Sequence, residues 1–220
     1  MRNPSRSLVP QQARSRQSLQ RLLHAAAEVL SQHGLAGATI PRIAKHAGLT
    51  PGAVYRRFKN KDVLLETMIL QLLEEQDKAL RQSITPEMAA QIRFAVLAEQ
   101  VIDGMLVSYR RKARLLRAVR QFTQDRHGTP FWQKVTKIEV RTMDYGVDLL
   151  VKSRGKIAHP DPRAAIGLAV VMIAGALWEI VVNTPDRILW RGLIPTDDQT
   201  LRRELTRCFL GYLGVETKEE

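Results

Sequence analysis

The chain has 220 residues, of which 45% are hydrophobic and 25% charged, a balance typical of soluble globular proteins that excludes a disordered chain. Its net charge is +12, and the excess is local: residues 1–61 hold 11 Lys and Arg against the single acid Glu28, whereas residues 62–220 hold 23 against 21. This asymmetry favours a polyanion-binding module in the first part of the chain, with a membrane-surface patch as the alternative. The single cysteine, Cys208, excludes an intramolecular disulfide framework, suits a reducing cytosol, and is expected to pack on an apolar helical face.

Residues 1–15 are rich in Arg, Ser, Gln and Pro, and we expect them to form a disordered basic arm. They contain no apolar core like that of a signal peptide, so we expect a cytoplasmic protein. Apolar residues then recur with helical spacing and predict a first helix over 15–33, closed by Gly34.

Two short helices are predicted next, each opened by a threonine. Thr39 is placed to cap a helix over 40–46, because its side-chain oxygen can accept a hydrogen bond from a free backbone N–H. Thr50 has the same place before a helix that runs to about Phe58, and Pro51 stands at the first helical position, where no N–H is missed.

Joined by Ala47-Gly48-Leu49, these helices predict a helix-turn-helix motif over about 39–58. In such a motif the second helix presents its N-terminal residues to DNA, and basic and aromatic side chains beyond them reach phosphates. Gly52 has no side chain, so the backbone can approach the DNA closely. The residues expected to contact DNA are Thr50, Pro51, Gly52, Ala53, Tyr55, Arg56, Arg57 and Lys61, the last of which opens a long fourth helix.

After the stretch SITPEM, longer helices are predicted over about 86–108, 111–125, 130–153, 161–183 and 197–213. No run shows sustained strand alternation, so the predicted fold class is all-α. We expect an N-terminal three-helix helix-turn-helix domain over 16–76 and a C-terminal helical domain over 77–220.

Residues 164–182 carry one charge, Glu179, and are long enough to cross a bilayer. A helix that is apolar on all sides is also typical of a core or dimer-interface helix, and no second span accompanies this one. We therefore interpret it as a soluble interface helix and expect no membrane partner. With the last helix of each subunit it predicts a four-helix dimer interface made by Ile166, Val170, Ile173, Leu177, Leu201, Leu205, Phe209 and Tyr212.

An enzyme is the competing class of protein. The chain has no G-x-S-x-G, H-E-x-x-H, P-loop or G-x-G-x-x-G motif. Asp144 and Asp148 form an i, i+4 carboxylate pair, but Lys137 and Arg141 share their face and favour a solvated ion-pair surface. The five histidines lack ligand spacing. We expect no enzymatic activity, no metal site and no cofactor.

The stretch LLHAAAEVLSQHGLAGATIPRIAKHAGLTPGAVYRRFKNKDVLL, residues 22–65, resembles the DNA-binding domain of the TetR (tetracycline-repressor) family of bacterial regulators. The matching residues are Ala25, Ala26, Gly34, Thr39, Ile43, Ala44, Ala47, Gly48, Leu49, Thr50, Gly52, Tyr55, Phe58, Lys61 and Leu64. Arg57 stands where the family often has His or Tyr, and Arg42 where an acid is frequent. Both strengthen the basic face, and we expect Arg42 also to contact DNA.

The resemblance implies a homodimer that binds a palindromic double-stranded DNA operator, as a repressor released by a small organic effector. It also implies that Thr39, Thr50, Tyr55 and Lys61 contact DNA, and that the C-terminal domain serves effector binding and dimerisation. A constitutive regulator of the same fold, without an effector, is the alternative.

Aromatic and Met residues of the C-terminal helices are either ordinary core or the lining of an effector pocket. The candidate pocket residues are Phe94, Met105, Tyr109, Phe122, Trp132, Met143 and Trp178. Arg110, Arg114 and Arg117 share one helical face, which is either solvated or holds an anionic effector at the pocket mouth.

Overall fold

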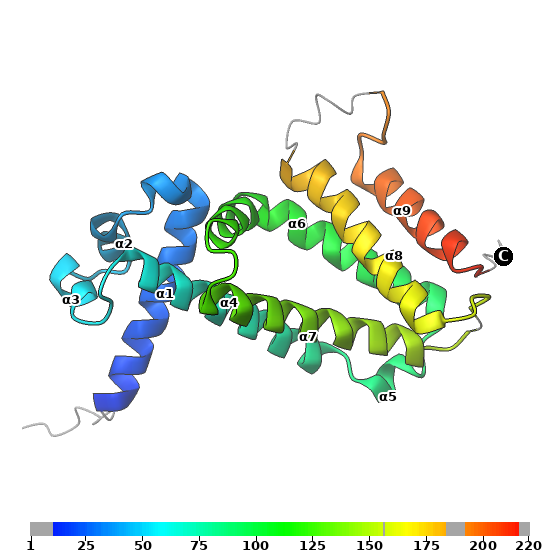
Figure 1. Cartoon of the computed structure of the whole chain (residues 1–220), viewed down its shortest axis with the longest axis horizontal. Coiled ribbons are helices and arrows are strands. Elements are labelled where there is room, and N and C mark those ends of the chain that lie inside the picture. The colour runs from blue at the N-terminus through cyan, green and yellow to red at the C-terminus, as the bar shows by residue number, and fades with distance from the viewer. Residues whose placement is uncertain (1–10, 156, 184–191, 216–220) are drawn as a thin grey trace, which may run out of the picture. The chain divides into compact units, whose positions relative to one another are not determined.

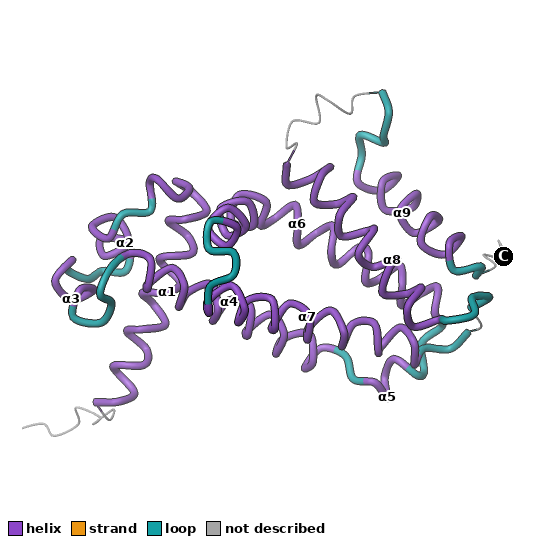
Figure 2. Tube along the Cα trace, in the orientation of Figure 1, coloured by secondary structure: helices purple, strands orange, loops and turns teal. Residues whose placement is uncertain are grey.

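The computed structural model describes residues 11–155, 157–183 and 192–215. The regular elements of these residues are helices, and one isolated β-bridge joins Arg93 to Arg154. The chain divides into two compact units, Met1–Gln71 and Leu72–Glu220. The predicted all-α fold class is confirmed. Figure 1 labels the helices and Figure 2 shows how short the connecting loops are in the described part.

The first unit contains α1 (Gln11–Gly37), α2 (Ile40–His46), α3 (Pro51–Tyr55) and the start of α4 (Lys61–Ser83). Its core is built from apolar residues at helical spacing, and the side chains of Leu22, Leu30, Ile43, Leu64 and Ile69 are fully buried. These contacts hold the short helices, which are too short to be stable alone.

Two predicted boundaries in this unit change. Residues 11–15, predicted as part of the arm, already belong to α1, whereas residues 1–10 lie outside the described part. Gly34 has the non-helical angles φ 64° and ψ −174°, so the regular part of α1 ends there as predicted, and a further short turn runs to Gly37. The third helix ends at Tyr55, before the predicted Phe58.

The second unit contains α5 (Pro86–Ala89), α6 (Phe94–Gln124), α7 (Pro130–Lys152), α8 (Pro162–Leu177), a π-helical turn η1 (Trp178–Asn183) and α9 (Asp198–Tyr212). In Figure 1, α8 and α9 lie side by side, and both pack against α6. The predicted break between 108 and 111 is wrong, since α6 is one continuous helix there. No Gly, Pro or capping residue follows Ser108 directly, and Tyr and Arg continue a helix readily.

Side-chain caps begin four of these helices, the first being α5, where Thr85 Oγ1 accepts a hydrogen bond from Met88 N at 3.3 Å. The side chains of Thr129, Asp161 and Asp197 accept hydrogen bonds from Trp132 N (3.2 Å), Ala164 N (3.0 Å) and Thr200 N (2.7 Å). The core lies among α6, α7, α8 and α9, where the rings of Phe94 and Phe209 stack with their centroids 6.2 Å apart.

The residues predicted for the dimer interface mostly belong to this core. The side chains of six of the eight are no more than 9% exposed, namely Ile166, Ile173, Leu177, Leu201, Leu205 and Phe209. A side chain buried in its own chain has almost no area left for a partner, so these six residues belong to the core of the second unit. Val170 is partly buried and Tyr212 is 40% exposed.

The exposed apolar face of α8 instead carries Leu168 (51% exposed), Val171 (51%) and Met172 (53%). Cys208, expected to pack on an apolar face, is exposed on α9. Among the residues described, one helix, Pro162–Asn183, is long and apolar enough to cross a membrane, with mean hydropathy 2.3 and 39% of its apolar window buried. The core helix of a soluble protein has the same composition, so this finding does not require a membrane.

Candidate nucleic-acid interface and ligand cavity

Both short helices of the helix-turn-helix start at the predicted caps. Thr39 Oγ1 accepts a hydrogen bond from Arg42 N at 3.4 Å, and Thr50 Oγ1 accepts one from Ala53 N at 3.2 Å. Between the helices Gly48 adopts φ 67°, a left-handed conformation that glycine takes without steric cost. Local chemistry therefore favours the conformation of the turn, and the core contacts hold the two helices in place.

One side of α3 is buried and the other is open to solvent. Val54 is fully buried and Phe58, just beyond the helix, is 6% exposed, so both anchor the motif. Tyr55 is 54% exposed, and Arg56 and Arg57 are exposed beside it. The exposed side thus combines positive charge with a phenol hydroxyl, the groups that bind DNA phosphates.

Gly52 lies on the exposed side of α3. A Cβ atom built on it meets no other atom within 4 Å. The protein itself therefore leaves room for a side chain at this position, and any need for glycine must come from a binding partner. Thr39, Thr50 and Pro51 are also exposed, and Ala53 is partly buried.

Two of the predicted DNA-contacting cations bind the protein's own backbone. Arg42 Nη1 donates to the carbonyl oxygen of Gly37 at 2.6 Å, and Lys61 Nζ donates to that of Leu35 at 3.2 Å. Both carbonyls belong to the last turn of α1, where cations offset the partial negative charge of unpaired C=O groups. Sequence spacing gave no sign of these contacts, because α1 and the two cations meet only in the folded domain.

The single acid of the basic region is also paired within the domain. Glu28 Oε2 lies 2.5 Å from His46 Nε2, and Glu28 Oε1 lies 3.5 Å from His24 Nδ1. The carboxylate of α1 is thereby joined to α2.

The predicted pocket residues do not form one site. Phe94 and Phe122 are core side chains, and Met105 packs against the core. Trp132 lies in a shallow surface groove on α7. Tyr109, Met143 and Trp178 do come together, and they line a cavity of about 760 Å³ among α6, α7, α8 and η1.

The same cavity contains polar residues that sequence reasoning missed. They are Arg120, Gln121, Gln124, Glu179 and Asn183, and Arg117 of the predicted arginine face joins them. A heptad-like spacing of polar residues on the second half of α6 was the available signal, but solvated helix faces show the same spacing.

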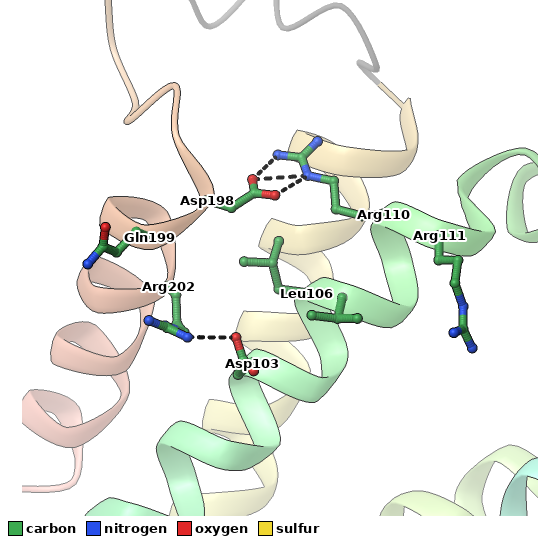
Figure 3. A pocket seen from close by; sticks show the side chains of 8 residues that line it. Asp103, Leu106, Arg110, Arg111, Asp198, Gln199 and Arg202 are labelled. Carbon is green, nitrogen blue, oxygen red and sulfur yellow. Dashed lines mark hydrogen bonds and ion pairs between the residues drawn. The ribbon is translucent and has the colours of Figure 1, made fainter.

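A second cavity, of about 610 Å³, lies between α6 and α9 and is crossed by two ion pairs (Figure 3). Arg110 Nη2 lies 2.7 Å from Asp198 Oδ1, and Arg202 Nη1 lies 3.0 Å from Asp103 Oδ1. Of the predicted arginine face, Arg110 thus forms an ion pair that joins α6 to α9. Arg114 is exposed.

Acidic residues outside these cavities form surface ion pairs. Asp144 and Asp148 both bind Arg163, where the sequence suggested Lys137 and Arg141. Among the residues that the structure describes, no three His, Cys, Asp or Glu side chains are grouped so as to hold a metal ion.

Comparison with known proteins places this arrangement in a family. The fold and the site define a class of protein in which a capped helix-turn-helix is followed by an all-helical domain. A family model described as "Bacterial regulatory proteins, tetR family" matches residues 22–68, from the middle of α1 into α4. Over these residues the N-terminal domain is similar to that of the tetR family of bacterial regulatory proteins.

Curated relatives share this domain. The HTH-type transcriptional regulator UidR of Escherichia coli (strain K12) is 35% identical over 66 residues, which are 30% of this chain and 32% of UidR. The chain therefore matches about a third of the length of that relative.

Solved structures share the fold of nearly the whole chain. A putative TetR-family transcriptional regulator from Mesorhizobium loti MAFF303099 has a TM-score of 0.62 at 18% identity, over 92% of this chain and 98% of that one. SmeT, the repressor of the Stenotrophomonas maltophilia multidrug efflux pump SmeDEF, has a TM-score of 0.57 at 20% identity, over 92% and 94%. At such identities the likeness concerns the fold alone.

Proposed function

We propose that the chain is a DNA-binding transcriptional regulator that represses from a palindromic operator and leaves it when a small ligand binds. This proposal is carried by the finding that the excess positive charge and the helix-turn-helix occur in the same domain. The surplus of positive charge, 11 Lys and Arg against one acid in residues 1–61, falls on the domain whose α3 exposes Tyr55, Arg56 and Arg57. Such a charge supplies the sequence-independent part of DNA affinity.

The exposed side of α3 divides by chemistry into two roles. Tyr55, Arg56 and Arg57 contact phosphates. Arg42 and Lys61 do so too, after giving up their hydrogen bonds to the carbonyl oxygens of α1. Thr50 and Ala53, at the start of α3, face base edges and select the sequence, since contacts in the major groove distinguish all four base pairs.

A homodimer follows from the apolar face of α8. Leu168, Val171 and Met172 lie at i, i+3 and i+4 on one side of the helix, and each is at least 51% exposed. A second copy covers such a face most simply through two-fold symmetry. A two-fold protein binds an operator with two inverted half-sites, which is why the proposed operator is palindromic.

Repression and release by an effector are supported by a similar fold and by a cavity. SmeT, whose fold is similar, is a repressor, and the chain contains a cavity of the size that small ligands need. The constitutive regulator without an effector stays the second candidate. In either case the protein works in the cytosol and catalyses no reaction.

Selection from a random duplex library tests the DNA-binding proposal. Purified full chain is mixed with random-sequence duplexes, and the bound fraction is amplified and sequenced. We expect an inverted repeat whose half-site centres are about 10 base pairs, or a multiple, apart. Arg57→Gln should weaken binding, whereas Arg203→Gln, the same loss of charge on α9, should not. Enrichment of no sequence, or equal loss from both variants, contradicts the proposal.

A further inference from the structure

The cavity among α6, α7, α8 and η1 has an uneven distribution of charge. Its volume of about 760 Å³ is within the range of small-molecule sites, about 300–1,000 Å³. Two guanidinium groups, those of Arg117 and Arg120, line it, and among its described lining residues the one carboxylate is Glu179. The lining therefore carries a positive excess.

Neither guanidinium forms an ion pair with a carboxylate of the described residues, and Glu139, whose charge acts on Arg120, does not line the cavity. Arg117 donates through Nε (3.1 Å) and Nη2 to the backbone oxygen of Val182, near the end of η1. Arg120 lies over the ring of Trp178, with Cζ 4.5 Å from the ring centroid. In the described part of the chain, no carboxylate lies within ion-pair distance of either group. Their charges are available to a ligand.

The acid of the cavity is directed into its own helical turn. Glu179 Oε2 accepts a hydrogen bond from Asn183 Nδ2 at 2.9 Å, and Asn183 Oδ1 accepts one from Trp178 Nε1 at 3.1 Å. These two hydrogen bonds fix the orientation of the Trp178 ring, which lines the cavity beside Arg120. A π-helical turn such as η1 is frequent at functional sites.

The cavity also has an apolar and aromatic part of its lining. This part is formed by Tyr109, Met143 and Val171 together with the Trp178 ring. Burial raises the pKa of Tyr109 above its ordinary value of 10.0, so the hydroxyl keeps its proton at neutral pH and is a hydrogen-bond donor. Gln121 and Gln124 add amide donors.

The cavity between α6 and α9 serves as a comparison, because its arginines are paired with carboxylates. There Arg110 and Arg202 each face a carboxylate across the groove, at 2.7 and 3.0 Å (Figure 3). An anion entering that groove competes with two existing ion pairs, whereas an anion entering the first cavity does not.

We propose that the cavity among α6, α7, α8 and η1 binds a small aromatic carboxylate. Its carboxylate accepts hydrogen bonds from Arg120 and Arg117, and its ring packs between Trp178 and Met143. Planar guanidinium groups suit planar carboxylates, because two parallel N–H donors meet two oxygens. The inference rests on the proposed function only in naming this ligand as the effector, since binding itself is independent of DNA.

Isothermal titration calorimetry on the full chain, without DNA, tests the ligand class. The probes are 2-naphthoate, its neutral isostere 2-naphthamide and the cation 2-naphthylmethylammonium. We expect 2-naphthoate to bind about 10-fold more tightly than the amide, since charge-assisted hydrogen bonds are roughly twice as strong as neutral ones. The cation should bind more weakly than either.

Two matched variants locate the effect. Arg120→Gln should lower the affinity for 2-naphthoate about 10-fold and leave that for the amide unchanged. Arg114→Gln removes the same charge from an exposed position on α6 outside the cavity, and should leave both affinities unchanged. Equal losses from the two variants would mean that a general field attracts the anion, and would overturn the site.

The wild-type comparison decides the matter even if Arg120→Gln fails to fold. Equal affinity for acid and amide, preference for the cation, or no binding of 2-naphthoate below about 1 mM, the weak limit for a specific site, overturns the proposal. A separate titration follows release of the selected operator by 2-naphthoate. If the acid binds as expected but operator affinity is unchanged, the ligand class stands and the effector part of the proposed function fails.

Discussion

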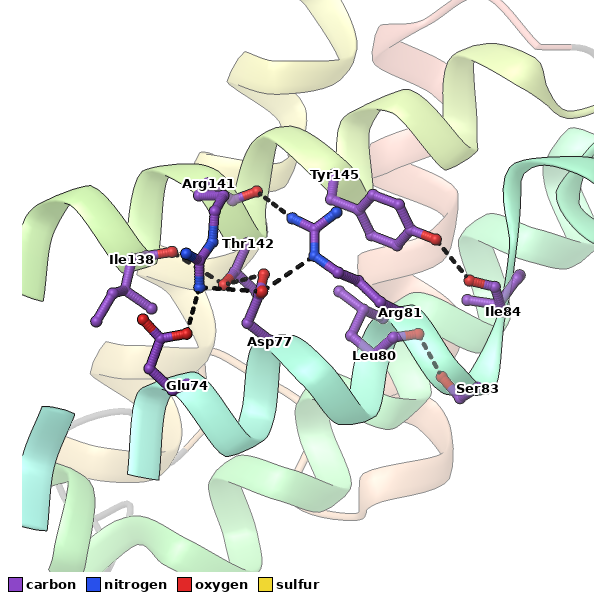
Figure 4. Close-up of polar contacts among 10 residues, drawn as sticks. All are labelled: Glu74, Asp77, Leu80, Arg81, Ser83, Ile84, Ile138, Arg141, Thr142 and Tyr145. Atoms are coloured by element: carbon purple, nitrogen blue, oxygen red, sulfur yellow. Dashed lines mark hydrogen bonds and ion pairs between the residues drawn. The ribbon is translucent and has the colours of Figure 1, made fainter. Parts of the chain in front are cut away.

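The carboxylate of Asp77 on α4 accepts a hydrogen bond from the Thr142 hydroxyl of α7 at 2.9 Å. Its second oxygen lies 3.0 Å from Arg81 Nε and 3.1 Å from Arg141 Nη2 (Figure 4). Asp77 is only 5% exposed, so its charge depends on these partners. The hydrogen bond from Arg81 does most to hold the pKa of Asp77 below its ordinary value, against the opposing effect of burial.

Removing this carboxylate should destabilise the second unit. Asp77→Ala leaves two guanidinium groups and a hydroxyl without their shared acceptor, and we expect a loss of about 2 kcal/mol in the free energy of unfolding. Chemical denaturation followed by circular dichroism measures it. Asp148→Ala, which removes an exposed carboxylate of α7 paired with Arg163, is the control and should change stability little. Equal effects of the two substitutions would refute a special role for Asp77.

The same group should make stability depend on pH. Because the folded-state pKa of Asp77 is lowered, its contribution is fully present above the unfolded value near 3.8 and is lost as pH falls through the folded value. The stability difference between wild type and Asp77→Asn should therefore be constant from pH 7 to about 5 and shrink below about pH 4. Urea denaturation at a series of pH values measures this. A difference that grows on acidification contradicts the assignment.

Substitution at Gly52 should separate DNA binding from folding. A side chain at Gly52 meets no atom of the protein within 4 Å, so Gly52→Trp should abolish operator binding and leave the melting temperature nearly unchanged. Gly48→Ala is the counterpart, because φ 67° strains alanine and should cost about 1 kcal/mol of stability. Anisotropy titrations and thermal melts read the two effects. Normal binding by Gly52→Trp would show that α3 does not approach DNA.

Phosphate binding should be visible in the salt dependence of DNA affinity. Lys61→Ala should weaken binding to operator and random duplex alike, and reduce the slope of log affinity against log salt by about one for each phosphate that the lysine neutralises. Tyr55→Phe removes a hydroxyl without charge, so it should weaken binding by about 1 kcal/mol per subunit and leave the slope unchanged. If Lys61→Ala leaves the slope as in wild type, the bond to Leu35 O is the whole role of this lysine.

Local features of the first unit were predictable from sequence, and the reasons are physical. Thr39, Thr50 and Gly48 act through backbone groups within a few residues, so their spacing alone encodes the caps and the turn. The break expected near Tyr109 was wrong because a change of residue character does not end a helix unless a breaker or cap accompanies it.

Features that need tertiary contacts were not predictable. Arg120 and Trp178 are far apart in the sequence, and only the packing of α6 against η1 brings them together. The apolar helix α8 posed a different problem: when all sides are apolar, periodicity cannot tell the side that faces the chain's own core from the side that is left exposed. Ile173 and Met172 are neighbours of similar hydrophobicity, yet one is 6% and the other 53% exposed.

The difference in exposure between Met172 and Ile173 provides a test of the dimer. Met172→Arg places a charge on the exposed face of α8, so it should convert a dimer into a folded monomer of 24.9 kDa. Ile173→Arg buries an unpaired charge in the chain's own core and should unfold the second unit instead. Sedimentation velocity and circular dichroism at micromolar concentration distinguish the two outcomes. A wild-type monomer would remove the dimer and with it the argument for a palindromic operator. A dimer that survives Met172→Arg would mean that another surface joins the subunits, because a charge in the centre of an apolar interface is not tolerated without a partner.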